Sequence, residues 1–421
     1  REPWLSFPGA LSLIPYLCNA VLFTIFCIPL VAVLRRRVGW LPAALISLAL
    51  LLLLEQTELA VAIAMFASIL IIERRPGERG MLAFAATGGL LAGIEMVGKL
   101  SVGPVVVVVL LLGLVGARAK ARDLCAFFAV LVTSMIGLWL LTGQPLADLP
   151  DFVANSLQIV AGYSEAMSLY DQSPVINLYF VVATAIATVA WILGGRYEDR
   201  PADLAAGAIA LVITFDKQAV IRIDGFHMAA FFSLVALLWV AIPPRPGLLP
   251  LSLAGMAAFA VTASLYATSV APGPGLDPVA NLSGFVSNTR TAFDSGRQER
   301  KIGASRDRLK DHYGVPPGLL RELDGHRTSV GPWEVMAAWA YEVDWSPAPV
   351  FQNYSAYTAK LDQLNADVIA SASGPDRILR HPGRNPKRPA RGIDGRRLAW
   401  DPPAQSVATL CNFRPVGQSF D

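Results

Sequence analysis

The sequence predicts an all-α polytopic membrane bundle that is followed by a small folded domain. Of the 421 residues, 54% are hydrophobic and only 16% are charged, and the mean hydropathy is +0.48. These values lie outside the usual balance of a soluble domain. The apolar residues are gathered into long runs, whereas charged residues and turn signals return toward the C-terminus. Together these observations predict a membrane protein with an appended polar domain.

The apolar runs set the predicted number of membrane crossings. A helix needs about 20 residues to cross a hydrocarbon core about 30 Å thick. Lys99, with glycines and Pro104 around it, separates two runs that would otherwise merge. The sequence therefore predicts about ten spans, several of them short, at residues 10–34, 39–54, 57–72, 81–98, 101–117, 123–142, 176–194, 203–215, 226–242 and 248–268.

The orientation of the bundle is predicted from the Lys and Arg residues in the short loops. One alternate set of loops, at 35–37, 73–80, 117–123, 196–203 and 243–247, holds twelve of them, and the opposite set holds Lys99, Lys217 and Arg222. Basic loops favour the cytoplasmic side. The C-terminal domain and Arg1 are then expected on the outer side. A chain that is already outside at a residue other than Met is expected to have had a segment upstream. One more helix, giving about eleven crossings in all, is the simplest such segment, and a cleaved signal peptide also agrees with the pattern.

Two domains are predicted, a transmembrane helical domain at 1–268 and an extracytoplasmic domain at 269–421. Within the second domain, residues 305–325 predict two short helices broken at Pro316 and Pro317. Helices are also predicted within 332–345 and 356–371, and a strand near residue 375. This mixture predicts a small α/β or α+β domain.

An outer loop at 143–175 interrupts the membrane domain. It contains no Lys or Arg, but it carries four acidic residues. Phe152, Leu157, Ile159 and Val160 have the spacing of an amphipathic helix that lies flat on the membrane. A surface-lying connector and a substrate-facing loop both agree with this pattern. Glu165, beside Tyr163, is the best acid here for substrate contact.

The segment FDKQAVIRIDGFH, residues 215–227, places five ionisable side chains between two apolar runs. They are Asp216, Lys217, Arg222, Asp224 and His227. A charge within a span is costly unless it is paired or hydrated, so such a cluster usually faces a cavity. Three interpretations remain open: a site for a phosphate or headgroup, a structural network of ion pairs, and a pathway for protons or ions.

The remaining candidate residues give weaker indications of a functional site. Glu95 and Lys99 are four residues apart in the order that favours a salt bridge within a helix. His312, His326 and His381 are scattered, and no spacing typical of a metal site is present. Tyr354, Tyr357 and Trp345 have faces on which a sugar could stack, although aromatic residues at such spacing are more often core.

The layout resembles the GT-C class of integral-membrane glycosyltransferases. Four segments also resemble recurrent segments of an uncharacterised bacterial group of this kind: GYSEAM at 162–167, the 215–227 segment, PVFQNYSAYTAKLDQLNA at 349–366 and IDGRRLAWDPP at 393–403. The resemblance implies a multi-pass protein of the bacterial inner membrane. It implies a hexosyl- or pentosyltransferase that moves a sugar from a polyprenyl-phosphate donor to a glycan, lipid or protein acceptor, without nucleic acid.

This chemistry needs a carboxylate to deprotonate the acceptor hydroxyl and cations to stabilise the leaving phosphate. The resemblance assigns Lys217, Arg222 and His227 to the donor phosphate, with Asp216 and Asp224 as partners. Tyr163, Glu95 and Lys99 are supporting candidates, and a divalent metal is left open.

The chain departs from the class at the catalytic acid. In GT-C enzymes that acid lies in the first outer loop, and by the predicted topology this loop lies mostly before Arg1. The catalytic base is therefore unassigned, with Glu165 as a weak candidate. A non-catalytic membrane subunit or scaffold and a secondary transporter remain as alternatives.

Overall fold

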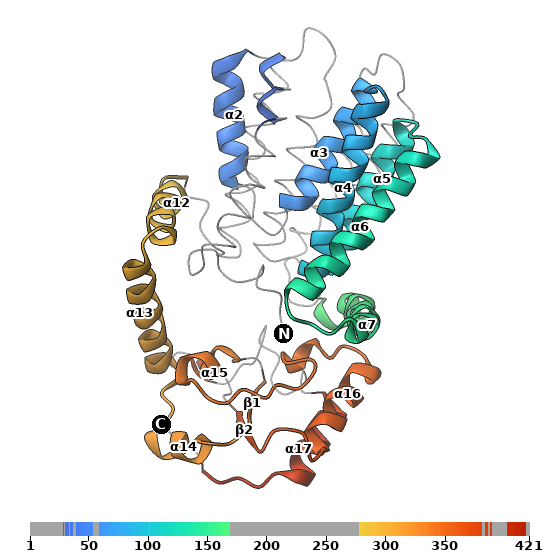
Figure 1. The fold of residues 1–421 in the computed structure, drawn as a ribbon. Helices are drawn as coiled ribbons and strands as arrows, with labels where there is room; N and C mark the ends of the chain where they lie inside the picture. The colour runs from blue at the N-terminus through green and yellow to red at the C-terminus, as the bar shows by residue number, and fades with distance from the viewer. Residues whose placement is uncertain are drawn as a thin grey trace. The chain divides into compact units, whose positions relative to one another are not determined.

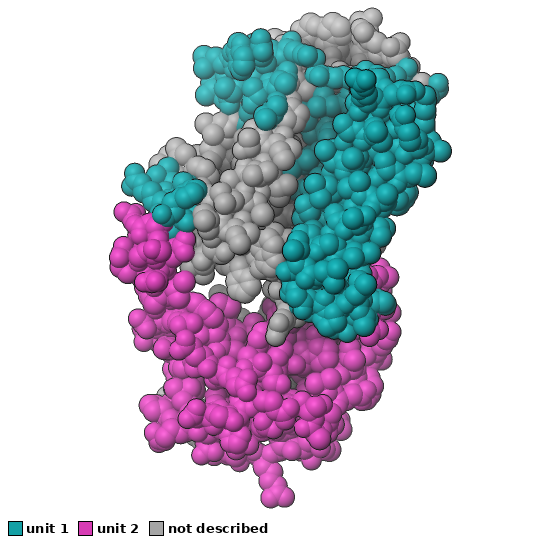
Figure 2. Space-filling view, in the orientation of Figure 1, with its two compact units in different colours: residues 1–150, 167–293 teal, residues 151–166, 294–421 magenta. Residues whose placement is uncertain are grey.

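The computed structural model describes the chain in several ranges. These are 28, 30–32, 34–36, 39–53, 59–100, 102–168, 278–332, 334–380, 384–385, 388–389 and 402–417. The chain divides into two compact units, which are coloured separately in Figure 2. Unit 1 comprises residues 1–150 and 167–293, and unit 2 comprises residues 151–166 and 294–421. The second unit therefore includes part of the predicted outer loop, at 151–166, and continues from Asp294.

The prediction of about ten membrane spans is wrong. Within the described ranges, only α4 (Glu78–Gly98) and α6 (Ala121–Leu141) are long and apolar enough to cross a membrane. The runs at 39–54, 57–72 and 101–117 form the shorter helices α2 (Trp40–Leu53), α3 (Leu59–Arg74) and α5 (Gly103–Gly116).

Helix length explains this error. A helix of 14 residues, such as α2 or α5, extends only about 21 Å at 1.5 Å per residue. This is less than the roughly 30 Å of a hydrocarbon core. An apolar run therefore predicted a helix at each of these places, but not a span. The remaining predicted spans lie mostly or wholly outside the described residues, at 10–34, 176–194, 203–215, 226–242 and 248–268.

Small residues bring α4 and α6 into close contact in unit 1. A Cβ atom on Gly89 would overlap the backbone of Phe127, and one on Gly93 would lie 2.7 Å from the carbonyl oxygen of Leu131 and overlap the Ser134 hydroxyl. Gly89 and Gly93 form a GxxxG pair, which permits the backbones of two helices to approach each other in a membrane. The α4–α6 contact therefore depends on glycine at these positions.

The helices α3 and α5 use the same kind of packing. Ser68 Oγ on α3 donates a buried hydrogen bond to the carbonyl oxygen of Val109 on α5, at 3.0 Å. A Cβ on Gly113 would lie 2.5 Å from that Ser68 hydroxyl, and one on Gly116 would lie 2.9 Å from Ile72. Small residues and a polar hydrogen bond between helices are both typical of helix packing within membranes.

Charged residues gather where α4 and α6 begin. Glu78 forms ion pairs with Lys120 and Arg122. The backbone N–H of Lys120 donates to the side chain of Asp123, which is only 2% exposed. The structure thus joins the basic segments 73–80 and 117–123, which the sequence assigned to the same side of the membrane.

Unit 2 contains most of α7 (Leu149–Met167) and the elements that follow residue 294 (Figure 1). A further helix, α12 (Pro278–Ala292), packs against α2 in unit 1. The elements of unit 2 after α7 are, in order, α13 (Ser295–Tyr313), α14 (Pro317–Leu323), β1 (Thr328–Gly331), α15 (Met336–Tyr341), η5 (Asn353–Ser355), α16 (Ala359–Ala370), β2 (Arg377–Arg380), β3 (Arg384–Asn385), β4 (Arg388–Pro389) and α17 (Pro403–Asn412).

Several local predictions for this unit are confirmed. The helix α13 ends at Tyr313 and α14 begins at Pro317, so the chain breaks at the two prolines as expected. The strand predicted near residue 375 is β2. It pairs in parallel with β1, with Thr328 opposite Arg377 and Gly331 opposite Arg380. The segment between these strands, which includes α15 and α16, therefore makes a crossover between parallel strands.

The helices α16 and α17 are held together by two buried polar side chains. The carboxylate of Asp362 on α16 accepts hydrogen bonds from the backbone N–H groups of Ala404 and Gln405 on α17, each at 2.8 Å. Asn365, which is fully buried, accepts from the N–H of Val350 and donates to its carbonyl oxygen and to Gln405 Oε1. Asp362 therefore caps the first turn of α17 from another helix.

We expect Asp362→Ala to lower the free energy of unfolding of unit 2 by about 2 to 4 kcal/mol. The substitution removes a charged acceptor, so the backbone N–H groups of Ala404 and Gln405 at the start of α17 lose their hydrogen-bond partner. Asp367→Ala is the matched control, because Asp367 is exposed on the same helix. Hydrogen exchange should show faster exchange of the α17 amides in the Asp362 variant alone. Equal protection of α17 in the two variants would contradict the capping role.

Candidate functional site

The five residues of the predicted donor site lie outside the described part of the chain. They are Asp216, Lys217, Arg222, Asp224 and His227. Their assignment to the donor phosphate remains a prediction. The other candidate residues, which are Glu95, Lys99, Tyr163 and Glu165, are all described.

The helix α7 packs on the polar domain through a glycine and a tyrosine. A Cβ on Gly162 would lie 2.5 Å from Tyr357 Cβ, so glycine permits the close approach. The rings of Tyr163 and Tyr357 meet edge to face, with their centroids 6.1 Å apart and their planes at 75°. Such aromatic pairs contribute about 0.5 to 1.5 kcal/mol beyond their buried area. The amphipathic helix predicted in the 143–175 loop is thus part of unit 2.

Glu165 lies on α7, two residues after Tyr163. Its side chain is exposed, so it is accessible to a ligand. Of the apolar residues named for this helix, Leu157 is 49% exposed and Val160 is 39% exposed. The helix therefore presents apolar side chains and a carboxylate on a surface that is anchored by Tyr163. The Glu165 carboxylate is therefore open to solvent on this surface.

Glu95 and Lys99 lie at the C-terminal end of α4. Lys99 has left the helical conformation and is the residue that ends the helix. Its backbone N–H donates to the carbonyl oxygen of Glu95, at 2.9 Å. The two residues are in unit 1, whereas Tyr163 and Glu165 are in unit 2.

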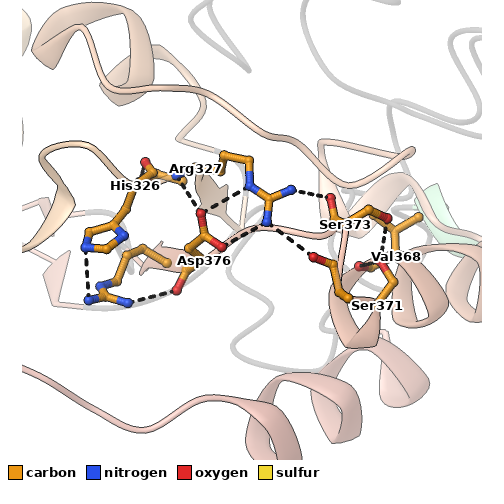
Figure 3. A network of polar contacts seen from close by, with 9 residues as sticks. His326, Arg327, Val368, Ser371, Ser373 and Asp376 are labelled. Atoms are coloured by element: carbon orange, nitrogen blue, oxygen red, sulfur yellow. Dashed lines mark hydrogen bonds and ion pairs between the residues drawn. The ribbon is translucent and has the colours of Figure 1, made fainter.

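A polar network at the start of the parallel strands was not predicted from the sequence (Figure 3). Arg327 donates from Nε and Nη2 to the two carboxylate oxygens of Asp376, at 3.1 and 2.9 Å, and from Nη1 to the carbonyl oxygen of Ser373, at 2.8 Å. The backbone N–H of Asp376 donates to the carbonyl oxygen of Arg327. Arg377 Nη2 lies 3.3 Å from His326 Nε2. The network fixes the register of β1 and β2.

The carboxylate of Asp376 is unsuited to act as a general acid or base. Its hydrogen bonds from the Arg327 side chain and the Arg327 backbone N–H lower its pKa from 3.8 to about 2. A general base works best with a pKa near the operating pH. The Arg327–Asp376 pair is therefore a structural contact.

The lowered pKa of Asp376 predicts a loss of stability in acid. Because the folded-state pKa lies below the ordinary value of 3.8, the contribution is complete above about pH 4 and is lost as the pH falls toward about 2. We expect Asp376→Asn to unfold more readily at pH 6 and to lose less stability than the wild type between pH 4 and pH 2. Thermal unfolding over this range provides the measurement. Parallel losses in both proteins would contradict the assignment.

The aromatic candidates of the domain are engaged with neighbouring groups. Trp345 meets Phe351 edge to face at 5.9 Å, and Tyr357 meets Tyr163. The hydroxyl of Tyr354 donates to Gln352 Oε1, at 3.2 Å. Among the residues that the structure describes, no group of three His, Cys, Asp or Glu side chains could hold a metal ion. The described residues thus favour no particular metal site.

No family model matches the chain, and comparisons with curated proteins and with solved structures give no significant match. The structure does relate two of the segments that carry the GT-C resemblance. Gly162 and Tyr163 belong to GYSEAM, and Tyr357 belongs to the 349–366 segment. These two segments, far apart in the sequence, are in contact within unit 2.

Proposed function

We propose that the protein is a membrane glycosyltransferase that moves a sugar from a polyprenyl-phosphate donor to an acceptor on the outer face of the bacterial inner membrane. The observation that carries the proposal is the docking of α7. This helix follows the membrane-length helix α6 after only a short connection, and Gly162 and Tyr163 attach it to the polar domain. An acidic helix that follows a membrane helix suits a reaction at the lipid surface.

The packing of unit 1 supports placement in a membrane. The helix α6 has large apolar side chains that the rest of the chain does not cover, among them Phe128, Val132 and Leu141, which are 47%, 49% and 77% exposed. Phe127, Leu131 and Ser134 of α6 lie against the glycines of α4. Apolar outer faces and small residues at helix contacts are typical of helices in lipid.

The proposed chemistry divides the work between cations and a carboxylate. Lys217, Arg222 and His227 bind the donor phosphate and stabilise the negative charge that develops when the sugar departs. A carboxylate accepts the proton of the acceptor hydroxyl. Glu165 is proposed for this second role because it is exposed and lies two residues from Tyr163, which contacts the polar domain. The proposal that Glu165 is the base therefore depends on the packing of α7 against the polar domain.

The test is a transfer assay with the purified protein in proteoliposomes. A polyprenyl-phosphate donor with a radiolabelled sugar is supplied, with envelope glycan, lipid and protein fractions as acceptors. We expect label to move into one acceptor fraction, and we expect Glu165→Gln to slow this transfer by about 100-fold or more. Asp151→Asn is the matched control, because Asp151 is also exposed on α7. A folded protein that transfers no label would instead favour a non-catalytic subunit.

A further inference from the structure

A small polar pocket lies where the parallel strands of unit 2 end. Gly331 and Arg380, the last residues of β1 and β2, both line it. The polar side chains that line the pocket are those of Ser329, Asn353, Arg380, Gln405, Ser406 and Thr409.

The amide of Gln405 is held in one orientation. Its Oε1 accepts a hydrogen bond from Asn365 Nδ2 at 2.9 Å, and Asn365 is itself fixed by two hydrogen bonds to Val350. The side chain of Gln405 is only 6% exposed, and its Nε2 has no hydrogen-bond partner among the described residues. Because Gln405 lines the pocket, this N–H can donate to an acceptor on a ligand there.

Other polar groups around the pocket are also available. The side chains of Ser329, Asn353 and Ser406 make no hydrogen bond to any part of the chain that the structure describes. Gly331 permits the Asn353 amide to lie over the end of β1, because a Cβ there would be 3.2 Å from Asn353 Nδ2. Arg380, in contrast, already has a partner in the chain. The available groups are therefore neutral hydroxyls and amides.

We propose that this pocket binds the hydroxyl groups of a saccharide. Serine hydroxyls and carboxamides each donate and accept, which matches the paired donor and acceptor character of sugar hydroxyls. The cavity volume is about 20 Å³, enough for about one water. The pocket therefore accepts the hydroxyl edge of one sugar ring, while the rest of the ring stays outside. This binding is independent of the proposed transfer reaction, since it requires neither donor nor catalytic carboxylate.

Saturation-transfer difference NMR on the full chain in nanodiscs tests this site. The probes are the methyl glycosides of glucose, galactose, mannose and arabinose. We expect at least one of them to bind, and we expect Ser329→Ala/Ser406→Ala to raise its Kd by about tenfold or more, since two hydrogen bonds are lost. Ser305→Ala is the control for the loss of a serine hydroxyl, because Ser305 lies on α13 and does not line the pocket. Its Kd should equal that of the wild type.

Hydrogen exchange of α16 and α17 shows whether each variant remains folded. Absence of binding by all four glycosides to the wild type would overturn the proposal, as would an equal Kd for the wild type and the folded double variant. Preference for acetate over the glycosides would also overturn it, because an anion would then be the ligand. Failure of the transfer assay alone leaves this result unaffected, since no donor is present.

Discussion

Gly89→Ala/Gly93→Ala is expected to lower the free energy of unfolding of unit 1 by about 3 kcal/mol or more. Each new methyl group would overlap the α6 helix, at Phe127 for Gly89 and at Ser134 and Leu131 for Gly93. Backbone atoms cannot move aside as a flexible side chain can, so α4 and α6 must separate. Overpacking of a close contact typically costs about 1 to 3 kcal/mol per site. The loss should appear as a lower Tm and a smaller yield of monodisperse protein.

Gly137→Ala is the matched control for this prediction. Gly137 lies on α6, and nothing lies within 4 Å of the position that its Cβ would take. Alanine has the higher helix propensity by about 1 kcal/mol, so this variant should be as stable as the wild type or more stable. A double variant of Gly89 and Gly93 with the stability of the control would show that α4 and α6 do not pack as described.

Lys217→Ala and Arg222→Ala are expected to abolish transfer from a polyprenyl-phosphate donor while the protein still folds. The proposed role of both cations is to stabilise the phosphate as it leaves. Removal of one such group typically costs about 100- to 1000-fold in rate. The measurement is the initial rate of label transfer by each purified variant. Size-exclusion elution and thermal unfolding establish that each variant is folded.

Arg300→Ala is the control for the removal of a cation. Arg300 is exposed on α13, and its loss should leave the rate of transfer unchanged. Full activity in both Lys217→Ala and Arg222→Ala would remove the phosphate role from the 215–227 segment. The ion-pair network of that segment would then be the better interpretation.

The positions of the apolar helices could be predicted from the sequence, but their membrane status could not. The runs at 39–54 and 101–117 predicted α2 and α5 to within a few residues. Hydropathy identifies a run of residues that avoids water. The length of the helix that the run forms decides whether it can span a bilayer. Short runs can bury their surface in packing instead, as α5 does where Gly113 and Gly116 meet Ser68 and Ile72 of α3.

The candidate site was less predictable because its contacts join distant residues. Tyr163 and Glu165 were identified from the sequence, whereas the contact of Tyr163 with Tyr357 depends on the fold. Gln405 and Asn365 give no local signal, since single carboxamides occur throughout polar segments. The proline break before α14 and the strand β2 were predictable because proline and β-branched residues act locally. The strand β1 was missed because its pairing with β2 is long-range.

A structure of the protein with a bound polyprenyl-phosphate sugar tests the central claim most directly. The account predicts the donor phosphate within hydrogen-bonding distance of Lys217 and Arg222, in a groove that opens to lipid on the outer face. It also predicts that Asp216 and Asp224 contact these cations and not the sugar. A donor phosphate bound elsewhere, with Lys217 and Arg222 paired only to Asp216 and Asp224, would contradict the account.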